Sequence, residues 1–368
     1  SRPAASSAGR LGSIGRKVDS TDVTRANRLA KFAAKRTSAS LLRQHDEKLA
    51  GRISACCYTA FSDGVSLDRI TRADGSVTGA FSGVVTCSSV WSCPVCSARI
   101  SLKRRDELNH LLAFARSAGH EVVMLTLTAR HNARTKLSPF LDDLKRSFKS
   151  LRQSRAWRAL PVIGTVTATE VTHGANGWHP HLHILMVLDA GSASAFDLIE
   201  TLRAQWLHQL SRQGRNGNDA AFQVQDASAA GEYIGKFGAG EELALGSVKH
   251  GRGAGSRSPW QILSDARDGC PKSCALWVEY SLAFKGKRQL HWSSGLKDLC
   301  GVNEVSDADC DDPNPIIERV SLRVWGAATW PSARRRLCAL FDAVETGADL
   351  DAAEFGLTDA ERWRAELA

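Results

Sequence analysis

Alternating apolar and polar positions begin after residue 52 and predict short paired strands. The apolar positions in these runs are Ile53, Val65, Leu67, Ile70 and Val77. Asp-Gly pairs at 63–64 and 74–75 interrupt the runs, and Asp-Gly is a strong signal for the turn of a β-hairpin. We therefore expect hairpins between residues 52 and 90.

Apolar residues at helical spacing alternate with β-branched runs through the middle of the chain. Residues 98–117 predict a helix that stops at Gly119, residues 122–128 a strand, and residues 139–160 a second helix. Helices are also expected at 24–43, 195–210 and 227–237. This order predicts an α+β fold with a central antiparallel sheet flanked by helices.

The most informative stretch, residues 162–188, predicts one antiparallel hairpin. Residues 162–172 alternate like a strand, residues 174–177 (Gly-Ala-Asn-Gly) form a turn signal, and residues 181–188 are a second apolar strand. If the turn centres on residues 175–176, Glu170 lies directly opposite His181.

Composition and charge narrow the class of protein. Of 368 residues, 43% are hydrophobic and 24% charged, as in a globular protein. No apolar run approaches the roughly 20 residues that cross a bilayer, so we expect a cytoplasmic protein with no membrane partner. Residues 1–300 hold 41 Lys and Arg against 25 Asp and Glu, whereas residues 301–368 hold 7 against 14. A basic main body suits a polyanion such as nucleic acid, although a merely soluble basic protein has the same balance.

Three histidines occupy alternate positions at the start of the second strand of the hairpin expected at residues 162–188. His181 and His183 point to one face because residues two apart in a strand share a face. Two neutral imidazoles are half of a divalent-metal site, and Glu170 across the strands supplies a carboxylate oxygen. His179 competes with Glu170 as the third ligand. The structural alternative is a set of surface histidines at a turn.

A second set of reactive residues lies on the expected helix at 227–237. Tyr233 and Lys236 are three residues apart and share a helix face, so the ammonium can favour the phenolate of a tyrosine nucleophile. The only other tyrosines are Tyr58 and Tyr280. A solvated helix face is the plainer interpretation of this pair.

Cysteine spacing predicts a structural zinc site. Cys93 and Cys96 form a C-x-x-C pair, with Cys87 six residues earlier and Cys56-Cys57 further back. We expect Cys56, Cys87, Cys93 and Cys96 to be the ligands, with Cys270 and Cys274 as rivals. Buried free cysteines are the alternative, because a disulfide framework is not expected in a cytoplasmic protein.

Basic segments and tryptophans add candidate contacts to DNA. The basic segments are 103–105, 145–149 and 285–288, and they could follow phosphates. Trp260, Trp277 and Trp292 could offer faces on which bases stack.

Three motifs in order resemble those of a known family. Residues 125–128 (Leu-Thr-Leu-Thr), 179–183 (His-Pro-His-Leu-His) and 233–236 (Tyr-Ile-Gly-Lys) look like motifs one, two and three of rolling-circle replication initiator (Rep) proteins. These belong to the His-hydrophobic-His (HUH) endonuclease superfamily, and the likeness is nearest to Rep proteins of actinobacterial plasmids. Residues 91–96 and 285–293 also look like that group, so the resemblance spans about residues 85–297.

The resemblance implies an HUH endonuclease fold and a metal-dependent, tyrosine-mediated nicking and joining of single-stranded DNA. His181 and His183 would bind Mg²⁺ or Mn²⁺, and Tyr233 would attack the scissile phosphate to give a 5′-phosphotyrosine intermediate. Single-stranded or hairpin DNA at a replication origin would be the partner, with a host helicase as a further candidate, in a bacterial cytoplasm. Some relatives carry a Glu four residues before the tyrosine, where this chain has Ala229.

The expected organisation has three parts. Residues 1–50 form a basic, loosely attached N-terminal arm, residues 51–300 the catalytic domain with the Cys-rich segment 85–97, and residues 301–368 an acidic extension.

An HUH transposase or relaxase with the same chemistry is one alternative function. A zinc-dependent DNA-binding regulator with structural histidines, and without catalysis, is another.

Overall fold

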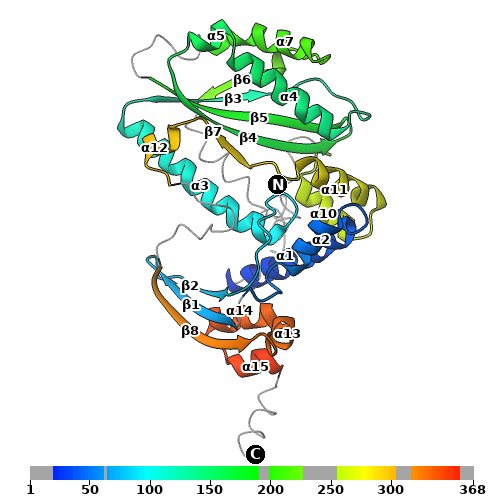
Figure 1. The fold of residues 1–368 in the computed structure, drawn as a ribbon, viewed down its shortest axis with the longest axis vertical. Helices are drawn as coiled ribbons and strands as arrows, with labels where there is room; N and C mark the ends of the chain where they lie inside the picture. The colour runs from blue at the N-terminus through cyan, green and yellow to red at the C-terminus, as the bar shows by residue number, and fades with distance from the viewer. Residues whose placement is uncertain (1–19, 62–63, 190–198, 227–254, 304–315, 357–368) are drawn as a thin grey trace, which may run out of the picture.

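The computed structural model describes residues 20–61, 64–189, 199–226, 255–303 and 316–356, which form an α+β fold (Figure 1). A five-stranded antiparallel sheet has the order β6-β3-β5-β4-β7. Its strands are β3 (Glu121–Leu127), β4 (Val162–Gly174), β5 (Gly177–Leu188), β6 (Phe222–Asp226) and β7 (Leu290–Trp292). A three-stranded antiparallel sheet, β2-β1-β8, lies at the other end of the molecule. The predicted α+β class is confirmed.

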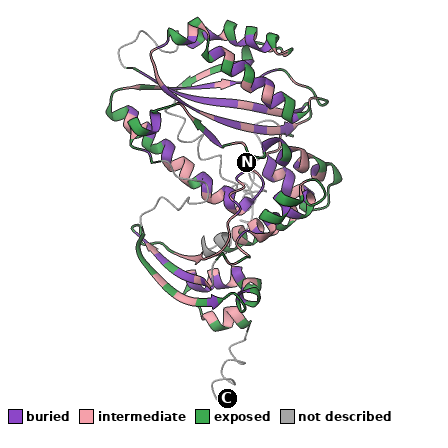
Figure 2. Ribbon diagram, in the orientation of Figure 1, coloured by how far each residue is buried: buried purple, intermediate pink, exposed green. Residues whose placement is uncertain are grey.

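One face of the five-stranded sheet is apolar along β3 and β5, because alternate residues of these two strands are apolar on that side. Leu125 and Ile184 are paired neighbours there, and both are fully buried. Helices cover this face, as the buried strands and helix surfaces in Figure 2 show. They are α4 (Leu137–Arg152), α5 (Arg155–Arg158) and α7 (Leu202–Arg212).

The opposite face of this sheet is divided into an apolar and a polar half. Leu185, Val187 and Met124 occupy the first half and pack against helices α3 (Pro94–Ser117) and α12 (Leu296–Cys300). The half nearer the β4–β5 turn carries histidine, threonine and glutamine side chains instead. The described helices therefore cover one end of this face, and the described part of the other end is polar.

The tip of the β4–β5 hairpin packs against a helical layer. Val171 and Trp178 are buried there with residues of α10 (Pro259–Arg267) and α11 (Pro271–Phe284). Trp260 and Trp277 belong to this core and are 7% and 0% exposed. Their expected role as stacking faces for bases is therefore wrong, because their rings are covered by protein.

Helix α1 (Ser20–Leu42) packs closely against the rest of the protein. Its Phe32 and Leu42 are buried, and it contacts α2 (Glu47–Ala55), α3, α10 and α11. A loosely attached arm was expected here, but the described part of that range is a packed helix. The local pattern predicted the helix and not its burial.

The three-stranded sheet joins distant parts of the sequence. Strand β1 (Gly64–Arg72) pairs with β2 (Val77–Ser82) through the predicted Asp-Gly turn at 74–75, and on its other side with β8 (Ile316–Gly326). Helices α13 (Trp330–Ala333), α14 (Leu337–Thr346) and α15 (Leu350–Phe355) complete this lobe. Sheet pairing therefore crosses the boundary expected near residue 300.

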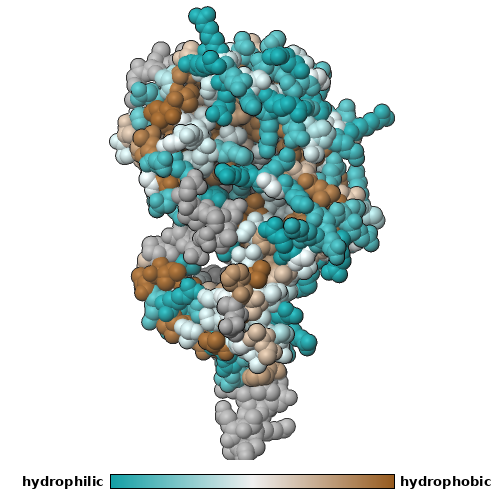
Figure 3. All heavy atoms as spheres, in the orientation of Figure 1, coloured by the Kyte–Doolittle hydropathy of each residue, from teal (hydrophilic) through white to brown (hydrophobic). Residues whose placement is uncertain are grey.

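The lobe formed by the three-stranded sheet and α13–α15 exposes apolar side chains to solvent. On β8, Ile317 and Val324 are 68% and 67% exposed, and apolar atoms gather on the lower lobe in Figure 3. Within the described ranges, no helix combines the length and apolar character needed to cross a bilayer.

Most expected boundaries in the middle of the chain agree with the structure. Helix α3 ends at Ser117 and Gly119 follows with a φ of +73°, as the stop signal predicted. The helix expected at 139–160 is interrupted between Arg152 and Arg155, which gives α4 and α5. The helix expected at 227–237 lies outside the described residues.

The β4–β5 turn depends on a glycine. Gly177 has a φ of +84°, a conformation that L side chains rarely adopt. A Cβ there would lie 2.9 Å from the Asn132 carbonyl oxygen, whereas a Cβ on Gly174 would have no neighbour nearer than 3.9 Å.

We predict that Gly177→Ala lowers the free energy of unfolding by about 1–2 kcal/mol or more, because it combines a left-handed backbone with a backbone clash. Gly174→Ala is the matched control and should change stability far less. Urea denaturation of both variants measures the difference. Equal stability of the two variants would contradict this account of the turn.

Candidate functional site

The β4–β5 pairing places Glu170 opposite His181, as the sequence predicted. The side chains of His179, His181 and His183 on β5 lie on one face of the sheet. The side chain of Glu170 on β4 lies on the same face. The ring centroids of His179 and His181 are 4.0 Å apart, and those of His181 and His183 are 5.8 Å apart. The histidines thus form a row along the polar half of the sheet.

A fourth histidine extends this row, and sequence analysis missed it. His131 lies in the loop after β3, and its ring stacks on His179 at 4.5 Å between centroids. It follows the Leu-Thr-Leu-Thr motif by three residues. That proximity to a motif was the only signal that could have pointed to it.

Two neighbours fix the ring of His183. Thr126 is its cross-strand partner on β3, and the Thr126 Oγ1 lies 3.0 Å from His183 Nδ1. On the other side, His183 Nε2 lies 3.0 Å from Glu170 Oε2. The Leu-Thr-Leu-Thr strand therefore supplies a partner that orients the histidine, which is how proteins commonly hold a ligating imidazole.

The histidines open into a cleft of about 620 Å³. Polar side chains line its walls, including Arg130, Asn176, Asn218, Gln223 and Gln225. One of these side chains is a cation and the others can donate hydrogen bonds. No Asp or Glu is among the described lining residues, but the Glu170 carboxylate lies 3.0 Å from His183, which is one of them. The cleft suits an anionic ligand.

Burial keeps the middle of the row uncharged. Burial, reinforced by the neighbouring His179 and His183, lowers the pKa of His181 to about 3, although Glu170 opposes the shift. Burial and His131 lower the pKa of His179 to about 4. Both imidazoles are therefore neutral at pH 7, the form in which histidine binds metal ions.

His183 Nε2 and Glu170 Oε2 have the spacing of two neighbouring ligands of a divalent metal ion, although His181 does not join them in a group within 4.8 Å. Two neighbouring ligands of an octahedral ion, each about 2.1 Å from it, are about 3.0 Å apart. That is the separation of His183 Nε2 and Glu170 Oε2. His181 lines the same cleft, and its buried Nδ1 has no hydrogen-bond partner among the described residues.

Tyr233 and Lys236 lie outside the described residues, as does Ala229. The described chain stops at Asp226, at the end of β6, and resumes at Gly255. Arg257 there exchanges backbone hydrogen bonds with His173, near the tip of the hairpin.

The two other tyrosines are engaged elsewhere. Tyr280 is 2% exposed and packs between Trp277 and Phe284 in the helical layer. Tyr58 lies outside the histidine cleft, and the Lys35 ammonium is 3.5 Å from the centre of its ring. Neither phenol lines the cleft.

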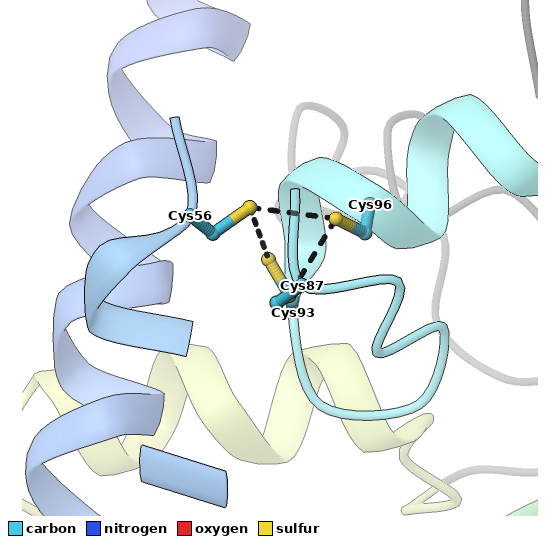
Figure 4. A group of neighbouring side chains, drawn as sticks. All are labelled: Cys56, Cys87, Cys93 and Cys96. Atoms are coloured by element: carbon cyan, nitrogen blue, oxygen red, sulfur yellow. Dashed lines mark hydrogen bonds between the residues drawn. The ribbon is translucent and has the colours of Figure 1, made fainter. Parts of the chain in front are cut away.

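A separate cluster forms from the four cysteines expected to bind zinc. Figure 4 shows Cys56, Cys87, Cys93 and Cys96 pointing toward one another. All four are buried free thiols, and their sulfur atoms lie within 4.8 Å of one another. Cys56 Sγ is 3.4 Å from Cys96 Sγ, and Cys87 Sγ is 3.5 Å from Cys96 Sγ. Tetrahedral zinc with 2.3 Å bonds separates its sulfurs by about 3.8 Å, so this cluster could hold the ion.

The four thiols of the cluster differ in how readily they ionise. Hydrogen bonds from the surrounding thiols hold the pKa of Cys96 well below its usual range. Burial raises the pKa of Cys93, and the contact with Cys57 raises the pKa of Cys56 to about 12. One thiolate is therefore favoured by its neighbours, and the remaining thiols need a metal ion to ionise.

The two cysteines considered as rival zinc ligands lie outside the cluster. Cys270 is exposed and Cys274 is partly exposed, and neither belongs to the cluster. In the part of the chain that the structure describes, no other histidine, cysteine or carboxylate group of three or more members meets the same 4.8 Å spacing.

Comparison with known proteins agrees with the motifs. Residues 81–314, more than half of the chain, match the Rep_1 family, described as "Replication protein". "Protein rep" of Streptomyces lividans is 26% identical over an alignment that covers 78% of this chain and 80% of that protein. "Protein rep" of Bacillus amyloliquefaciens is 28% identical and covers 45% of this chain and 50% of its own length. No solved structure matches the chain significantly.

We predict about one zinc ion per chain in protein purified without added zinc. Cys93→Ser should lose the ion and unfold at lower temperature, because the remaining thiolates cannot close the tetrahedron. Cys270→Ser should keep both metal and stability. Elemental analysis and thermal denaturation give the result, and a stoichiometry near zero would contradict the prediction.

The buried histidines predict a pH dependence for the metal-free protein. Their folded-state pKa values of about 3 and 4 lie below the value near 6.5 expected in the unfolded chain. Between these values only the unfolded chain binds the protons, so the free energy of unfolding should fall as the pH is lowered from about 7 to 4.5. A variant in which both His179 and His181 are replaced by Gln should lose less of its free energy of unfolding over this pH range.

Urea denaturation at pH 7 and pH 5 measures this difference. The exposed His110→Gln is the matched control and should keep the wild-type pH dependence. An equal loss in all three proteins would show that other groups cause it.

Proposed function

Since the chain belongs to the Rep_1 family of replication proteins, we propose that it initiates rolling-circle replication by nicking and rejoining single-stranded DNA. The observation that carries the proposal is the row of histidines beside Glu170, which lines a polar cleft. A merely structural set of histidines has no need of an open cleft. Family membership favours a replication initiator over a transposase or relaxase.

Three residues would hold the catalytic ion. His181 and His183 would supply imidazole nitrogens, and Glu170 would supply a carboxylate oxygen. A bound Mg²⁺ or Mn²⁺ would polarise the scissile phosphate and help neutralise the charge that develops on it. His179, stacked beside His181, remains the rival third ligand.

The rest of the cleft would bind and orient the strand. Arg130 lies on its wall with the amide side chains of Asn218 and Gln223. A guanidinium and amide N–H groups are suitable donors to phosphate oxygens. Thr126 would hold the His183 ring in position while the strand binds.

Tyr233 is the proposed nucleophile. Tyr280 is buried, and Tyr58 lies outside the cleft, so neither competes well for the role. Tyr233 follows Asp226 by seven residues, which span at most about 25 Å. Asp226 pairs with Val123, three residues along β3 from Thr126, so the length of chain is sufficient to reach the cleft.

The proposed reaction exchanges one phosphodiester for another. The Tyr233 oxygen forms a bond to phosphorus, the bond from phosphorus to the 3′ oxygen breaks, and the phenol proton ends on the 3′-hydroxyl. Lys236, one helical turn away if this segment is helical, would favour the phenolate. No nucleotide is consumed, so the 5′-phosphotyrosine link can be reversed to rejoin the strand.

The proposal includes an HUH arrangement of the five-stranded sheet. Strand β5 carries the two histidines and lies inside the sheet, between β3 and β4. Strand β3 carries the Leu-Thr-Leu-Thr motif next to it. The cysteine cluster would stabilise the region before α3 rather than take part in the reaction.

We predict that His181→Ala with His183→Ala abolishes cleavage of a single-stranded origin oligonucleotide in Mn²⁺, and that DNA binding stays within about threefold of wild type. Glu170→Gln should lower cleavage without unfolding the protein, because Glu170 is on the cleft side of β4. Circular dichroism and a gel-shift assay are the controls. Loss of folding in the double variant would favour structural histidines and the regulator hypothesis.

We predict that Tyr233→Phe forms no covalent DNA adduct but binds the same oligonucleotide with near-normal affinity. The change removes one oxygen and leaves the phosphate contacts in place. Tyr280→Phe is the matched control and should form the adduct. Mass spectrometry of the proteolysed adduct identifies the modified peptide, and nucleotide on Tyr280 would overturn the assignment.

A further inference from the structure

The wall of the histidine cleft on the side away from Glu170 is β6, an edge strand of the five-stranded sheet (Figure 1). Gln223 on β6 pairs with Thr126 on β3, and Thr126 pairs with His183 on β5. Residues paired directly in a sheet point to the same face, so the Gln223 side chain lies on the polar face with the histidines. Neighbouring strands are about 4.8 Å apart, which puts the Gln223 backbone roughly 10 Å from that of His183.

Gln225 repeats this arrangement further along β6. Residues two apart in a strand share a face and are about 7 Å apart, and both glutamines line the cleft. Both are exposed, whereas Phe222 and Val224, which alternate with them, pack on the apolar core of the opposite face. Strand β6 therefore presents two neighbouring amides at a spacing similar to that of successive nucleotides in an extended DNA strand.

The two amides are available to a ligand. Among the described residues, the side chains of Gln223 and Gln225 have no hydrogen-bond or salt-bridge partner. Asn176 and Asn218 add two further amides to the same lining. Each amide offers N–H donors and a carbonyl acceptor. The cleft thus has donors and acceptors placed side by side.

Amides differ from cations in what they can recognise. Phosphate oxygens only accept hydrogen bonds, so lysine and arginine hold them whatever the DNA sequence. An amide presents a donor beside an acceptor, which matches a base edge such as N6 and N7 of adenine. Although the chain has 48 Lys and Arg residues, Arg130 is the only one among the described lining residues of the cleft. The composition of this wall therefore favours contacts that distinguish bases.

The plainer interpretation is that these amides are solvent-facing residues of an edge strand. Exposed edge strands are usually protected from pairing with other chains by charged side chains, above all Lys. The described side chains on the polar face of β6 carry no charge. Protection of the edge therefore does not explain glutamine at both positions.

We propose that Gln223 and Gln225 recognise the bases next to the scissile phosphate and so determine which DNA sequence is nicked. This inference rests on the proposed cleavage of single-stranded DNA in the histidine cleft. Bases of a single strand expose their edges to such contacts because no complementary strand covers them. Arg130 would hold a phosphate of the same strand and would add affinity without sequence preference.

The experiment selects bound strands from a pool of single-stranded oligonucleotides with a random segment and then sequences them. The protein is the full chain with His181→Ala and His183→Ala, so cleavage does not alter the pool. Gln223→Met and Gln225→Met are added singly, because methionine keeps the side-chain length and removes the amide. Gln205→Met is the matched control, since Gln205 is exposed on α7, which covers the opposite face of the sheet.

With both glutamines present, the selected strands should share preferred bases at two neighbouring positions. Gln223→Met should reduce the preference at one position about tenfold, and Gln225→Met should do so at the other. Affinity for the unselected pool should stay within about threefold, because the phosphate contacts remain. Gln205→Met should leave the pattern unchanged. Gln223→Glu should shift the preferred base toward cytosine, because a carboxylate accepts a hydrogen bond from cytosine N4.

Three results would overturn the inference. They are the absence of any base preference, the same selected sequences in all variants, and an equal loss of affinity for the whole pool in both Met variants. Circular dichroism of each variant shows that it is folded.

The selection measures binding alone, so it separates this inference from the proposed cleavage. If selection depends on the glutamines but the chain with intact histidines forms no adduct with the selected strand in Mn²⁺, the cleavage proposal fails and base recognition by the cleft stands. If the chain with intact histidines and both Met variants nick the same sequences equally well, base recognition fails and the cleavage proposal stands.

Discussion

The register of β4 against β5 decides which reactive side chains of this protein can meet. In an antiparallel pair the side-chain period is two, so a slip of one residue would move every histidine of β5 to the face that packs on α4. The observed register puts Glu170 opposite His181 and brings the Glu170 carboxylate to within 3.0 Å of His183. The same register lets β3 present Thr126 to His183. The pairing of β4 with β5 therefore decides which side chains meet at the site, how the His183 ring is oriented and which face of the sheet lines the cleft. Gly177 helps to fix this pairing at the turn between the two strands.

The cysteine cluster constrains the other half of the molecule in a different way. It joins the end of α2, through Cys56, to the start of α3, through Cys93 and Cys96. Cys93 and Cys96 lie at the N-terminus of α3, where unpaired backbone N–H groups favour thiolates. With zinc bound, four thiolates would leave two net negative charges in a buried place. Lys35, which is 1% exposed and donates to the Cys56 carbonyl, and Arg99, which interacts with Cys96, are placed to balance them.

Local pattern predicted those parts of the site that are encoded locally. The β4–β5 turn, the position of Glu170 and the C-x-x-C pair all depend on residues close in sequence. His131 was missed because it approaches His179 only after β3 and β5 pair across about 50 residues. The burial of Trp260 and Trp277 was missed because a tryptophan in a sequence does not reveal which helices will cover it. The pairing of β1 with β8 was missed because no local feature of the β8 sequence indicates which strand it will pair with.

That last pairing has a consequence for how the protein is made. Strand β1 ends at Arg72 and β8 begins at Ile316, so a ribosome must add more than 200 residues before β1 can acquire its second neighbour. During that interval one edge of β1 exposes unpaired backbone groups, which invite pairing with another nascent chain. The four cysteines, in contrast, are all synthesised by residue 96. Metal capture by the emerging chain would secure α2 and the start of α3 early, and the availability of zinc during translation would then govern how much of the protein escapes aggregation.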